Sequence, residues 1–380
     1  MIIGIDASNL LFGGGRTHLI ELLSSAEPHL YDISKIIVWG RNSTLELLPL
    51  RSWLVKRALP VLEYGYLRRS LWQLFELPAL ARSEGISLLF SPGGHVGFRF
   101  QPTVTMSRNM LPFEIRELLR YGFSEKTLRL LILRYTQSRS FRSSTGVIFL
   151  TNYAQIKVQE VTGSLQGMTA TIPHGVNSRF FGVPRAKRLM NRGTIKPLRL
   201  IYVSYIDVYK HQWNVVEAIN CLRLEGYNLL LDLVGPSYSR AQHRLNLILN
   251  KFDPQRLWVH EHGSVAYDQI HALYKLADLG IFASSCENMP NILLETMASG
   301  LPIACSDRGP MPEILGEAGL YFDPENPLSI ADCLRMLLDD PQVSANLAIA
   351  SYQKAQQYTW THCADQTLQF LSRVATKAKR

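Results

Sequence analysis

The chain has 380 residues, 47% of them hydrophobic and 19% charged, so it is long enough for two domains and can bury a substantial core. This composition excludes a disordered, collagen-like or coiled-coil protein. Its five cysteines include no C-x-x-C pair, which argues against a zinc site or a disulfide framework and favours a reducing compartment. No apolar run approaches the ~20 residues of a membrane-spanning helix, and the first residues lack the pattern of a signal peptide.

The net charge of +9 is unevenly distributed. Residues 1–190 contain 23 Lys and Arg against 12 Asp and Glu, whereas residues 191–380 contain 17 against 19. The basic residues of the first half cluster in 51–82 and 116–144, among leucines and aromatics at helical spacing. Such stretches suit a helix lying on an anionic membrane. They suit equally a helix that packs one side on the core and exposes its basic side to solvent. No recognised nucleic-acid-binding module is present, so we expect no nucleic-acid partner.

Apolar runs typical of strands alternate with stretches of helical spacing along the whole chain. The strands expected in the first half are residues 2–6, 35–40, 86–91, 103–107 and 146–151, and those in the second half are 198–204, 227–235, 256–263, 279–284 and 301–307. Continuous apolar strands separated by helices predict parallel sheets covered on both faces, one in each half. The predicted fold is therefore α/β, with two doubly wound Rossmann-like domains and a ligand cleft between them.

The polar, basic segment 185–197 is the expected linker between the two domains. We accordingly expect an N-terminal domain over 1–184 and a C-terminal domain over 198–359. The last stretch, 360–380, is expected to form a helix that packs back towards the first domain.

The first loop of interest follows strand 2–6 and contains Gly13, Gly14 and Gly15 at the start of a helical stretch. Consecutive glycines let the backbone approach a phosphate or a sugar, and a helix N-terminus favours negative charge. The pattern is neither G-x-G-x-x-G nor a P-loop, so a simple tight connection explains it as well.

Lys210 lies in the loop after strand 198–204. An ammonium group in this place can neutralise a diphosphate as charge moves onto the leaving group. Taken alone, such a lysine is equally well explained as a solvent-exposed residue.

The stretch ENMPNILLE, residues 287–295, sets two glutamates eight positions apart around the start of a helix. Glu287 falls in the loop before the helix and Glu295 within it. Backbone N–H groups near Asn291 and Ile292 would point towards an anion. Carboxylates accept hydrogen bonds from vicinal hydroxyls, so one can hold a ribose and the other a sugar ring. Without further context, one capping and one solvated glutamate explain the pattern as well.

Together these motifs resemble a known family. The E-x7-E motif and the following MASGLPIACSDRGPMPEILGEAGLYFDPENP are similar to the signature of the family 4 glycosyltransferases, retaining enzymes of the GT-B fold. The glycine loop, IPHGVNSRFF, Lys210 and the final WTHCADQTLQFL stand in family order, so the resemblance covers nearly the whole chain. SRNMLPFE and ENMPNILLE resemble bacterial transferases that build O-antigen, capsule or exopolysaccharide chains.

The resemblance implies that the domain over 1–184 binds the acceptor and that the domain over 198–359 binds the nucleotide sugar. It also implies a role for each matching position. Glu295 corresponds to the glutamate that binds the donor's ribose, and Glu287 to the one beside the transferred sugar. Lys210 and the amides at the helix start would bind the diphosphate, which the glycine loop would approach from the first domain. The family transfers the sugar by front-face displacement without a metal or other cofactor, and the chain accordingly has no D-x-D motif.

Two positions depart from the family pattern. Where the family has Gly-Arg ahead of the lysine, this chain has Ser204-Tyr205. The candidates for the missing cation are Arg308 and Arg16; alternatively, the donor's phosphates rely on the backbone amides and Lys210 alone. Many members also carry a histidine after the fourth strand of the first domain, where this chain has SRNM. The candidates for its place are His95, Arg108 and Asn109.

The sequence thus predicts a retaining, metal-independent hexosyltransferase. It would move a sugar from a nucleotide-diphosphate donor to a polyprenyl-diphosphate-linked saccharide, as in lipopolysaccharide synthesis. It is expected in the cytoplasm, peripheral at the inner face of the cytoplasmic membrane. A nucleotide-sugar epimerase on the same scaffold and an inactive nucleotide-sugar-binding protein are the alternatives. The first half lacks an obvious acid/base carboxylate pair, which counts against the epimerase. The retained glutamates and lysine count against the inactive protein.

Overall fold

The computed structural model describes residues 1–11, 13–94, 100–185 and 196–378. By their internal contacts, the residues form two units. The first comprises Met1–Ile115, Phe123–Gly175 and Thr359–Arg380, and the second comprises Arg116–Gly122 and Val176–Tyr358. Most of the expected linker, residues 186–195, lies outside the described residues.

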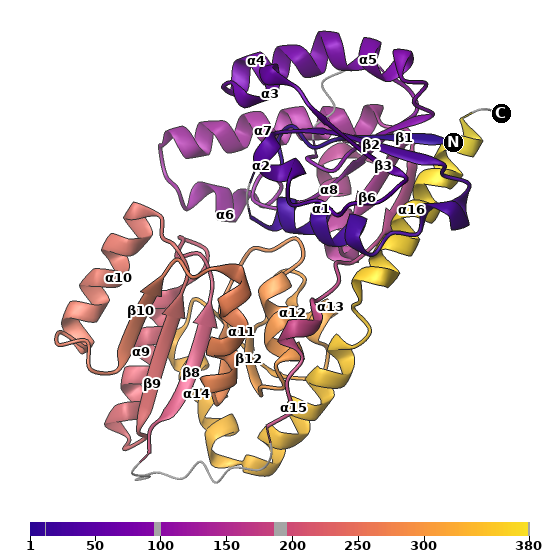
Figure 1. The fold of residues 1–380 in the computed structure, drawn as a ribbon. Coiled ribbons are helices and arrows are strands. Elements are labelled where there is room, and N and C mark those ends of the chain that lie inside the picture. Colours follow the sequence, from indigo (N-terminus) through magenta and orange to yellow (C-terminus); the bar gives the residue numbers. More distant parts are fainter. Residues whose placement is uncertain (12, 95–99, 186–195, 379–380) are drawn as a thin grey trace. The chain divides into compact units, whose positions relative to one another are not determined.

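The first unit is a parallel sheet with helices on both faces (Figure 1). Its strands are β1 (Ile2–Asp6), β2 (Lys35–Gly40), β3 (Leu54–Ala58), β4 (Leu88–Ser91), β5 (Thr103–Met106), β6 (Gly146–Phe149) and β7 (Met168–Thr171). Its helices are α1 (Gly14–Ser24), α2 (Asn42–Leu45), α3 (Pro60–Glu63), α4 (Tyr66–Leu71), α5 (Leu77–Ser83), α7 (Glu125–Ser143), α8 (Asn152–Thr162) and α16 (Trp360–Lys377), with a 3-10 helix η1 (Pro28–Tyr31) and a π-helical turn η2 (Trp72–Glu76). The strand order is β3-β2-β1-β4-β5-β6-β7, so the order reverses between β1 and β4.

The second unit repeats this plan with strand order β10-β9-β8-β11-β12-β13. Its strands are β8 (Leu198–Val203), β9 (Leu229–Val234), β10 (Val259–Gly263), β11 (Leu279–Phe282), β12 (Ile303–Ser306) and β13 (Leu320–Phe322). Its helices are α6 (Ile115–Leu119, all but its first residue), α9 (Gln212–Leu224), α10 (Ser239–Phe252), α11 (Tyr267–Leu276), α12 (Asn291–Ala298), α13 (Met311–Leu315), α14 (Pro327–Asp339) and α15 (Pro341–Ala355), with a 3-10 helix η3 (Ser178–Phe180). Here the order reverses between β8 and β11, and ligands of doubly wound sheets bind beyond the carboxyl ends of the strands at such a point.

The predicted fold class is confirmed, since both sheets are wholly parallel and Rossmann-like. Each expected strand is present within a few residues of its predicted bounds. The sequence reading missed β3 and β7, in which polar residues interrupt the apolar ones, and β13, which has only three residues. None of the helices that the structure describes is both long enough and apolar enough to cross a bilayer.

The chain passes from one unit to the other at residues that differ from the expected boundary at residue 184. Residues 176–184 pack with the second unit, because Gly182 N donates to Ala298 O (3.0 Å) and Arg185 N to Gly300 O (2.8 Å) just beyond α12. Residues 116–122 belong to the second unit although their neighbours on both sides belong to the first. At the other end of the chain, α16 packs on α1 and β4 in the first unit.

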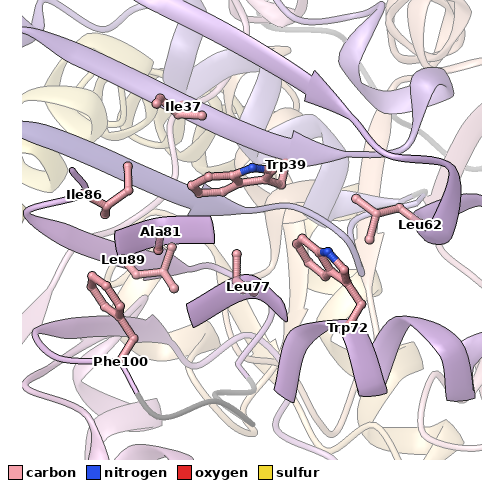
Figure 2. Packing of buried hydrophobic residues seen from close by; sticks show 9 residues of the cluster. All are labelled: Ile37, Trp39, Leu62, Trp72, Leu77, Ala81, Ile86, Leu89 and Phe100. Atoms are coloured by element: carbon pink, nitrogen blue, oxygen red, sulfur yellow. The ribbon is translucent and has the colours of Figure 1, made fainter. Parts of the chain in front are cut away.

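The basic, aromatic stretch 51–82 is not one helix. It begins with strand β3 and continues through α3, α4, η2 and α5. Its inward residues, Trp72, Leu77 and Ala81, pack against Trp39 and other residues of the sheet (Figure 2). The core-facing interpretation therefore holds for one side of this stretch, while other large apolar side chains, Phe75 among them, are exposed.

Trp72 and Phe75 therefore provide a matched test of which side stabilises the fold. Trp72 is 1% exposed and Phe75 is 68% exposed. We expect Trp72→Ala to lower the free energy of unfolding by about 3–5 kcal/mol, because it leaves a large cavity. Phe75→Ala should change it by less than about 0.5 kcal/mol. Urea-induced unfolding of both variants measures this, and equal losses would contradict the packing described.

Candidate functional site

The switch point of the second sheet brings Lys210 and Glu287 together. Lys210 lies in the loop after β8, and Glu287 lies in the loop after β11. The Lys210 ammonium group forms an ion pair with Oε1 of Glu287, and the two side chains are only 7% and 17% exposed. The sequence placed both residues in loops at this sheet edge, but their direct pairing could not be read from the spacing.

The backbone around Lys210 is fixed from several sides. Lys210 N donates to Asp207 O (3.0 Å), and the Tyr202 hydroxyl donates to Lys210 O (2.8 Å). The next residue, His211, is in the left-handed region at φ 52° and directly precedes α9. Non-glycine residues keep this conformation where their surroundings fix it, often at functional sites. Ser285 N donates to Tyr209 O (2.8 Å), so the two loops of the site are joined directly.

Helix α12 directs its N-terminus into the same loop. It begins at Asn291 after Pro290, has no side-chain cap and has no acidic residue in its first turn. The positive end of its dipole is therefore not neutralised by its own residues. The Asn291 N–H, expected to be free for an anion, instead donates to Met289 O (3.0 Å).

Glu295 lies within α12, as expected, and is almost completely buried. Burial raises the pKa of its carboxyl group to about 8, although a hydrogen bond with Tyr267 and the charge of Arg179 act in the opposite direction. The Arg179 guanidinium group lies over the ring of Tyr267, 5.5 Å from its centroid. A neutral carboxyl group can both donate and accept a hydrogen bond, which suits a pair of vicinal hydroxyls.

Sequence reasoning missed Arg179 and Tyr267 as neighbours of Glu295. Arg179 stands in IPHGVNSRFF, which served only as a marker of family order, and Tyr267 lies in HGSVAYD. Both flank glycine-containing loops, but nothing in their spacing indicates that they meet around one carboxyl group.

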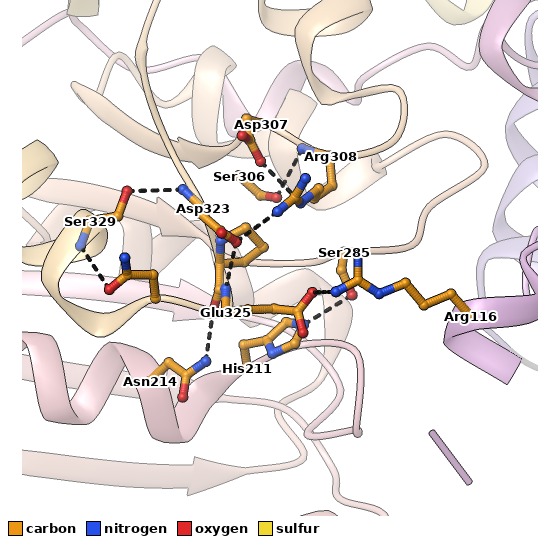
Figure 3. A network of polar contacts seen from close by, with 12 residues as sticks. Arg116, His211, Asn214, Ser285, Ser306, Asp307, Arg308, Asp323, Glu325 and Ser329 are labelled. Atoms are coloured by element: carbon orange, nitrogen blue, oxygen red, sulfur yellow. Dashed lines mark hydrogen bonds and ion pairs between the residues drawn. The ribbon is translucent and has the colours of Figure 1, made fainter. Parts of the chain in front are cut away.

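Arg308, one candidate for the missing cation, is already paired with carboxylates. Its guanidinium group contacts Asp307 Oδ1 (3.3 Å) and Asp323 Oδ1 (2.9 Å) (Figure 3). Although partial burial acts against it, these carboxylates raise the pKa of Arg308. Its positive charge is therefore already balanced within the second unit.

In the first unit, the glycine loop lies against Arg108. A Cβ atom on Gly15 would come within 2.7 Å of Nη1 of Arg108, so any other residue here would displace the Arg108 side chain. The Nε of Arg108 is buried and has no hydrogen-bond partner among the described residues. Burial lowers the pKa of Arg108 to about 10, so the group is still a cation at neutral pH. Gly14 and Gly15 thus begin α1 beside a buried positive charge.

The other first-unit candidates are less informative. Asn109 Oδ1 accepts a hydrogen bond from Leu111 N (3.1 Å), which closes a local turn. Arg16 is half-buried in the first turn of α1. His95 lies outside the described residues.

Comparison with known proteins places this site in a family context. Residues 197–340 match the family described as "Glycosyl transferases group 1", and this range contains Lys210, Glu287, Glu295 and Arg308. The chain is 29% identical to the O-antigen chain mannosyltransferase B of Escherichia coli over 44% of each protein. It is 29% identical to the D-inositol 3-phosphate glycosyltransferase of Corynebacterium diphtheriae over 26% of this chain and 23% of that protein. In each case the chain spans less than half the length of the relative.

Solved structures share the fold over nearly the whole chain. Sucrose-phosphate synthase from Thermosynechococcus elongatus superposes with a TM-score of 0.77 at 17% identity, covering 99% of this chain and 100% of that one. Anabaena HepE in complex with UDP and glucose gives a TM-score of 0.70 at 18% identity, covering 98% and 100%. WaaG, a glycosyltransferase involved in lipopolysaccharide biosynthesis, gives 0.69 at 12% identity, covering 98% and 99%. At these identities the likeness establishes the GT-B type of fold.

The raised pKa of Glu295 predicts how the free energy of unfolding depends on pH. Below about pH 4.5 the carboxyl group is protonated in both the folded and the unfolded state. Between about pH 4.5 and pH 8 the folded state keeps a proton that the unfolded state releases, so the free energy of unfolding should fall as the pH rises. We expect Glu295→Gln to remove a fall on the order of a few kcal/mol. Urea unfolding across this range measures it, with the exposed Glu317→Gln as the control. A variant with the same slope as the wild type would contradict the burial of an ionisable carboxyl group here.

Proposed function

We propose that the protein is a retaining glycosyltransferase that uses a nucleotide-diphosphate sugar as its donor. The observation that carries this proposal is the Lys210–Glu287 pair at the switch point of the second sheet, beside the uncapped N-terminus of α12. A cation and a helix N-terminus suit a diphosphate, and a carboxylate suits the hydroxyls of a sugar. The match of residues 197–340 to the glycosyltransferase model supports this assignment.

Each group then has a distinct task. Lys210 and the α12 N-terminus would stabilise the negative charge that develops on the leaving diphosphate. Glu287 would exchange its contact with Lys210 for hydrogen bonds from the transferred sugar, and Glu295 would hold the ribose hydroxyls. In the proposed front-face displacement, the bond from the anomeric carbon to the donor phosphate breaks. The acceptor hydroxyl forms the new bond on the same face, and its proton passes to the departing phosphate. We expect this transfer to need no metal, because the lysine and the helix N-terminus supply the positive charge.

The alternatives receive less support. Of the relatives and solved structures described above, all except HepE are named as transferases or synthases, and none is named as an epimerase. An inactive binding protein would not need to keep a buried lysine paired with a glutamate, because burying an ion pair has a large desolvation cost. We therefore infer that the pair is kept for its chemistry.

The acceptor is proposed to be a lipid-linked saccharide of a cell-surface polysaccharide, reached from the cytoplasmic face of the membrane. The O-antigen mannosyltransferase relative supports this class of acceptor. In the first unit, exposed apolar residues repeat at helical spacing on α4 and η2 (Leu67, Leu71, Leu74, Phe75) and on α7 (Leu128, Leu131, Ile132, Tyr135). Arginines such as Arg68 and Arg129 are exposed beside them. Apolar residues flanked by cations suit an anionic bilayer surface.

A panel of UDP-, GDP-, ADP- and dTDP-sugars should identify the donor. A ligand present at about 100 times its dissociation constant should stabilise the native state by ~2.7 kcal/mol, which a thermal-shift assay detects. We expect one nucleotide class to act, and its effect to be lost in Lys210→Ala and Glu295→Ala but kept in the control Lys251→Ala, an exposed lysine. Sugar transfer measured in the presence of a chelator should persist and should be lost in Glu287→Ala. A folded Glu287→Ala protein with full turnover would exclude the proposed site.

Binding to vesicles of anionic lipid tests the membrane proposal separately. We expect the protein to sediment with such vesicles at low salt and to be released as the ionic strength rises, because salt screens the attraction of exposed arginines. Leu71→Ser combined with Phe75→Ser should weaken binding, because both exposed side chains lose their apolar contact with the bilayer. The matched control is Leu224→Ser, an exposed leucine of the second unit. No binding at low salt would remove the membrane proposal and leave the transferase proposal intact.

A further inference from the structure

Residues 116–122 come from the first half of the chain but pack within the second unit. Two arginines of this segment hold one carboxylate. Nη2 of Arg116 lies 2.7 Å from Oε1 of Glu325, and Nη2 of Arg120 lies 2.8 Å from Oε2 of the same residue. Although partial burial opposes it, the two arginines keep the pKa of Glu325 below its ordinary value. Figure 3 shows Arg116 reaching Glu325, with His211 and Ser285 directly beside it.

The end of the segment is fixed at a second place. The Tyr121 carbonyl accepts a hydrogen bond from Nη1 of Arg240 (3.1 Å). The Tyr121 ring meets the ring of Tyr238 edge to face, with centroids 5.8 Å apart. Burial and the nearby Asp207 carboxylate both raise the pKa of Tyr121. The segment therefore contacts the loop that carries Asp207, three residues before Lys210.

Between these anchors, Glu117 reaches into the loops of the candidate site. It is 5% exposed, and its Oε2 accepts a hydrogen bond from the Ser285 hydroxyl at 2.6 Å. Arg120 balances its charge through two further hydrogen bonds, at 2.7 and 3.1 Å. Both oxygens of this buried carboxylate accept hydrogen bonds, one of them two, so its position is well defined.

His211 extends this hydrogen-bond chain to the neighbour of Lys210. Nε2 of His211 lies 2.9 Å from the Ser285 hydroxyl oxygen. Burial, with the charge of Arg120, lowers the pKa of His211 to about 3, so the ring is neutral. Because the Ser285 hydroxyl donates to Glu117, the ring must donate to Ser285, which places its proton on Nε2. The series of hydrogen bonds therefore runs from His211 through Ser285 to Glu117.

We propose that Glu117 is a positioning residue for the Lys210–Glu287 pair and acts through Ser285 and His211. His211 follows Lys210 directly, and Ser285 stands two residues before Glu287. One carboxylate from a distant segment thus fixes the two loops from which the ion pair projects. The inference rests on the proposed function only for what the pair does, because the contacts themselves lie among described residues of one unit.

The network supplies its own control. Arg116 lies on the same segment, but its side chain is 70% exposed and its ion pair is with Glu325. Removing it leaves the contacts from Glu117 to Ser285 and His211 in place. Arg116→Ala is therefore matched to Glu117→Ala, and Ser285→Ala breaks the same chain from the other side with a smaller change in volume.

The first readout does not depend on any substrate. The rate at which an amine-acylating reagent modifies Lys210, followed by mass spectrometry, reports how well its ion pair is held. We expect Glu117→Ala and Ser285→Ala each to raise this rate about tenfold, the effect of losing a hydrogen bond to a charged group. The rate at the exposed Lys251 should not change, and Arg116→Ala should behave as the wild type. In the variant that combines Glu117→Ala with Ser285→Ala, the acylation rate of Lys210 should be no higher than in either single variant. Both substitutions remove the same contact between Glu117 and Ser285.

The second readout is sugar transfer. Glu117→Ala and Ser285→Ala should lower kcat per folded molecule about tenfold while the thermal midpoint of Ser285→Ala stays near that of the wild type. Unchanged Lys210 acylation in Ser285→Ala, or an equal change in Arg116→Ala, would overturn the positioning role. If no nucleotide sugar binds but the acylation rates differ as expected, the positioning role stands and the proposed function fails.

Discussion

The structure of the site depends on keeping a lysine and a glutamate paired where little water reaches them. Lys210 and Glu287 are almost buried, so their mutual attraction must offset the cost of removing both charges from water. That balance requires good geometry, and the surrounding contacts supply it. The Tyr202 hydroxyl, the Asp207 carbonyl and the Ser285 amide all fix the backbone on which the pair is mounted. A ligand bearing a diphosphate and sugar hydroxyls would offer Lys210 a partner of opposite charge and would offer Glu287 hydrogen-bond donors.

The fold could be predicted because its signals are local and repeated. Continuous apolar strands such as β8 and β9 indicate burial on both faces, and the helices between them require parallel pairing. Strand β3 could not be predicted, because its outward residues are basic and half-exposed and it joins a stretch with helical spacing. The placement of residues 116–122 in the second unit was also hidden, because only long-range contacts, such as Arg116 with Glu325, determine it.

The site could be predicted only as a set of loops. The positions of Lys210 and Glu287 follow from the alternation of strands and helices, since loops after neighbouring parallel strands meet at one edge. The state of each group could not be predicted in this way. The pKa of Glu295 depends on burial by residues distant in sequence, and the charge of Arg308 is balanced by Asp323, which no motif connects with it. Electrostatic state is a property of the packed structure, whereas loop position is largely a property of chain order.

Chain connectivity gives the segment 116–122 a further consequence. The chain passes from one unit to the other at four junctions, after residues 115, 122, 175 and 358. Any change in the relative position of the units must be taken up at these junctions, and glycines stand at two of them, Gly122 and Gly175. The first two junctions directly flank the segment that carries Glu117. The segment that carries Glu117, which accepts a hydrogen bond from Ser285, is thus covalently continuous on both sides with the unit that contains the glycine loop and Arg108. The path of the chain between the units therefore runs through the segment whose Glu117 contacts the loop of Glu287.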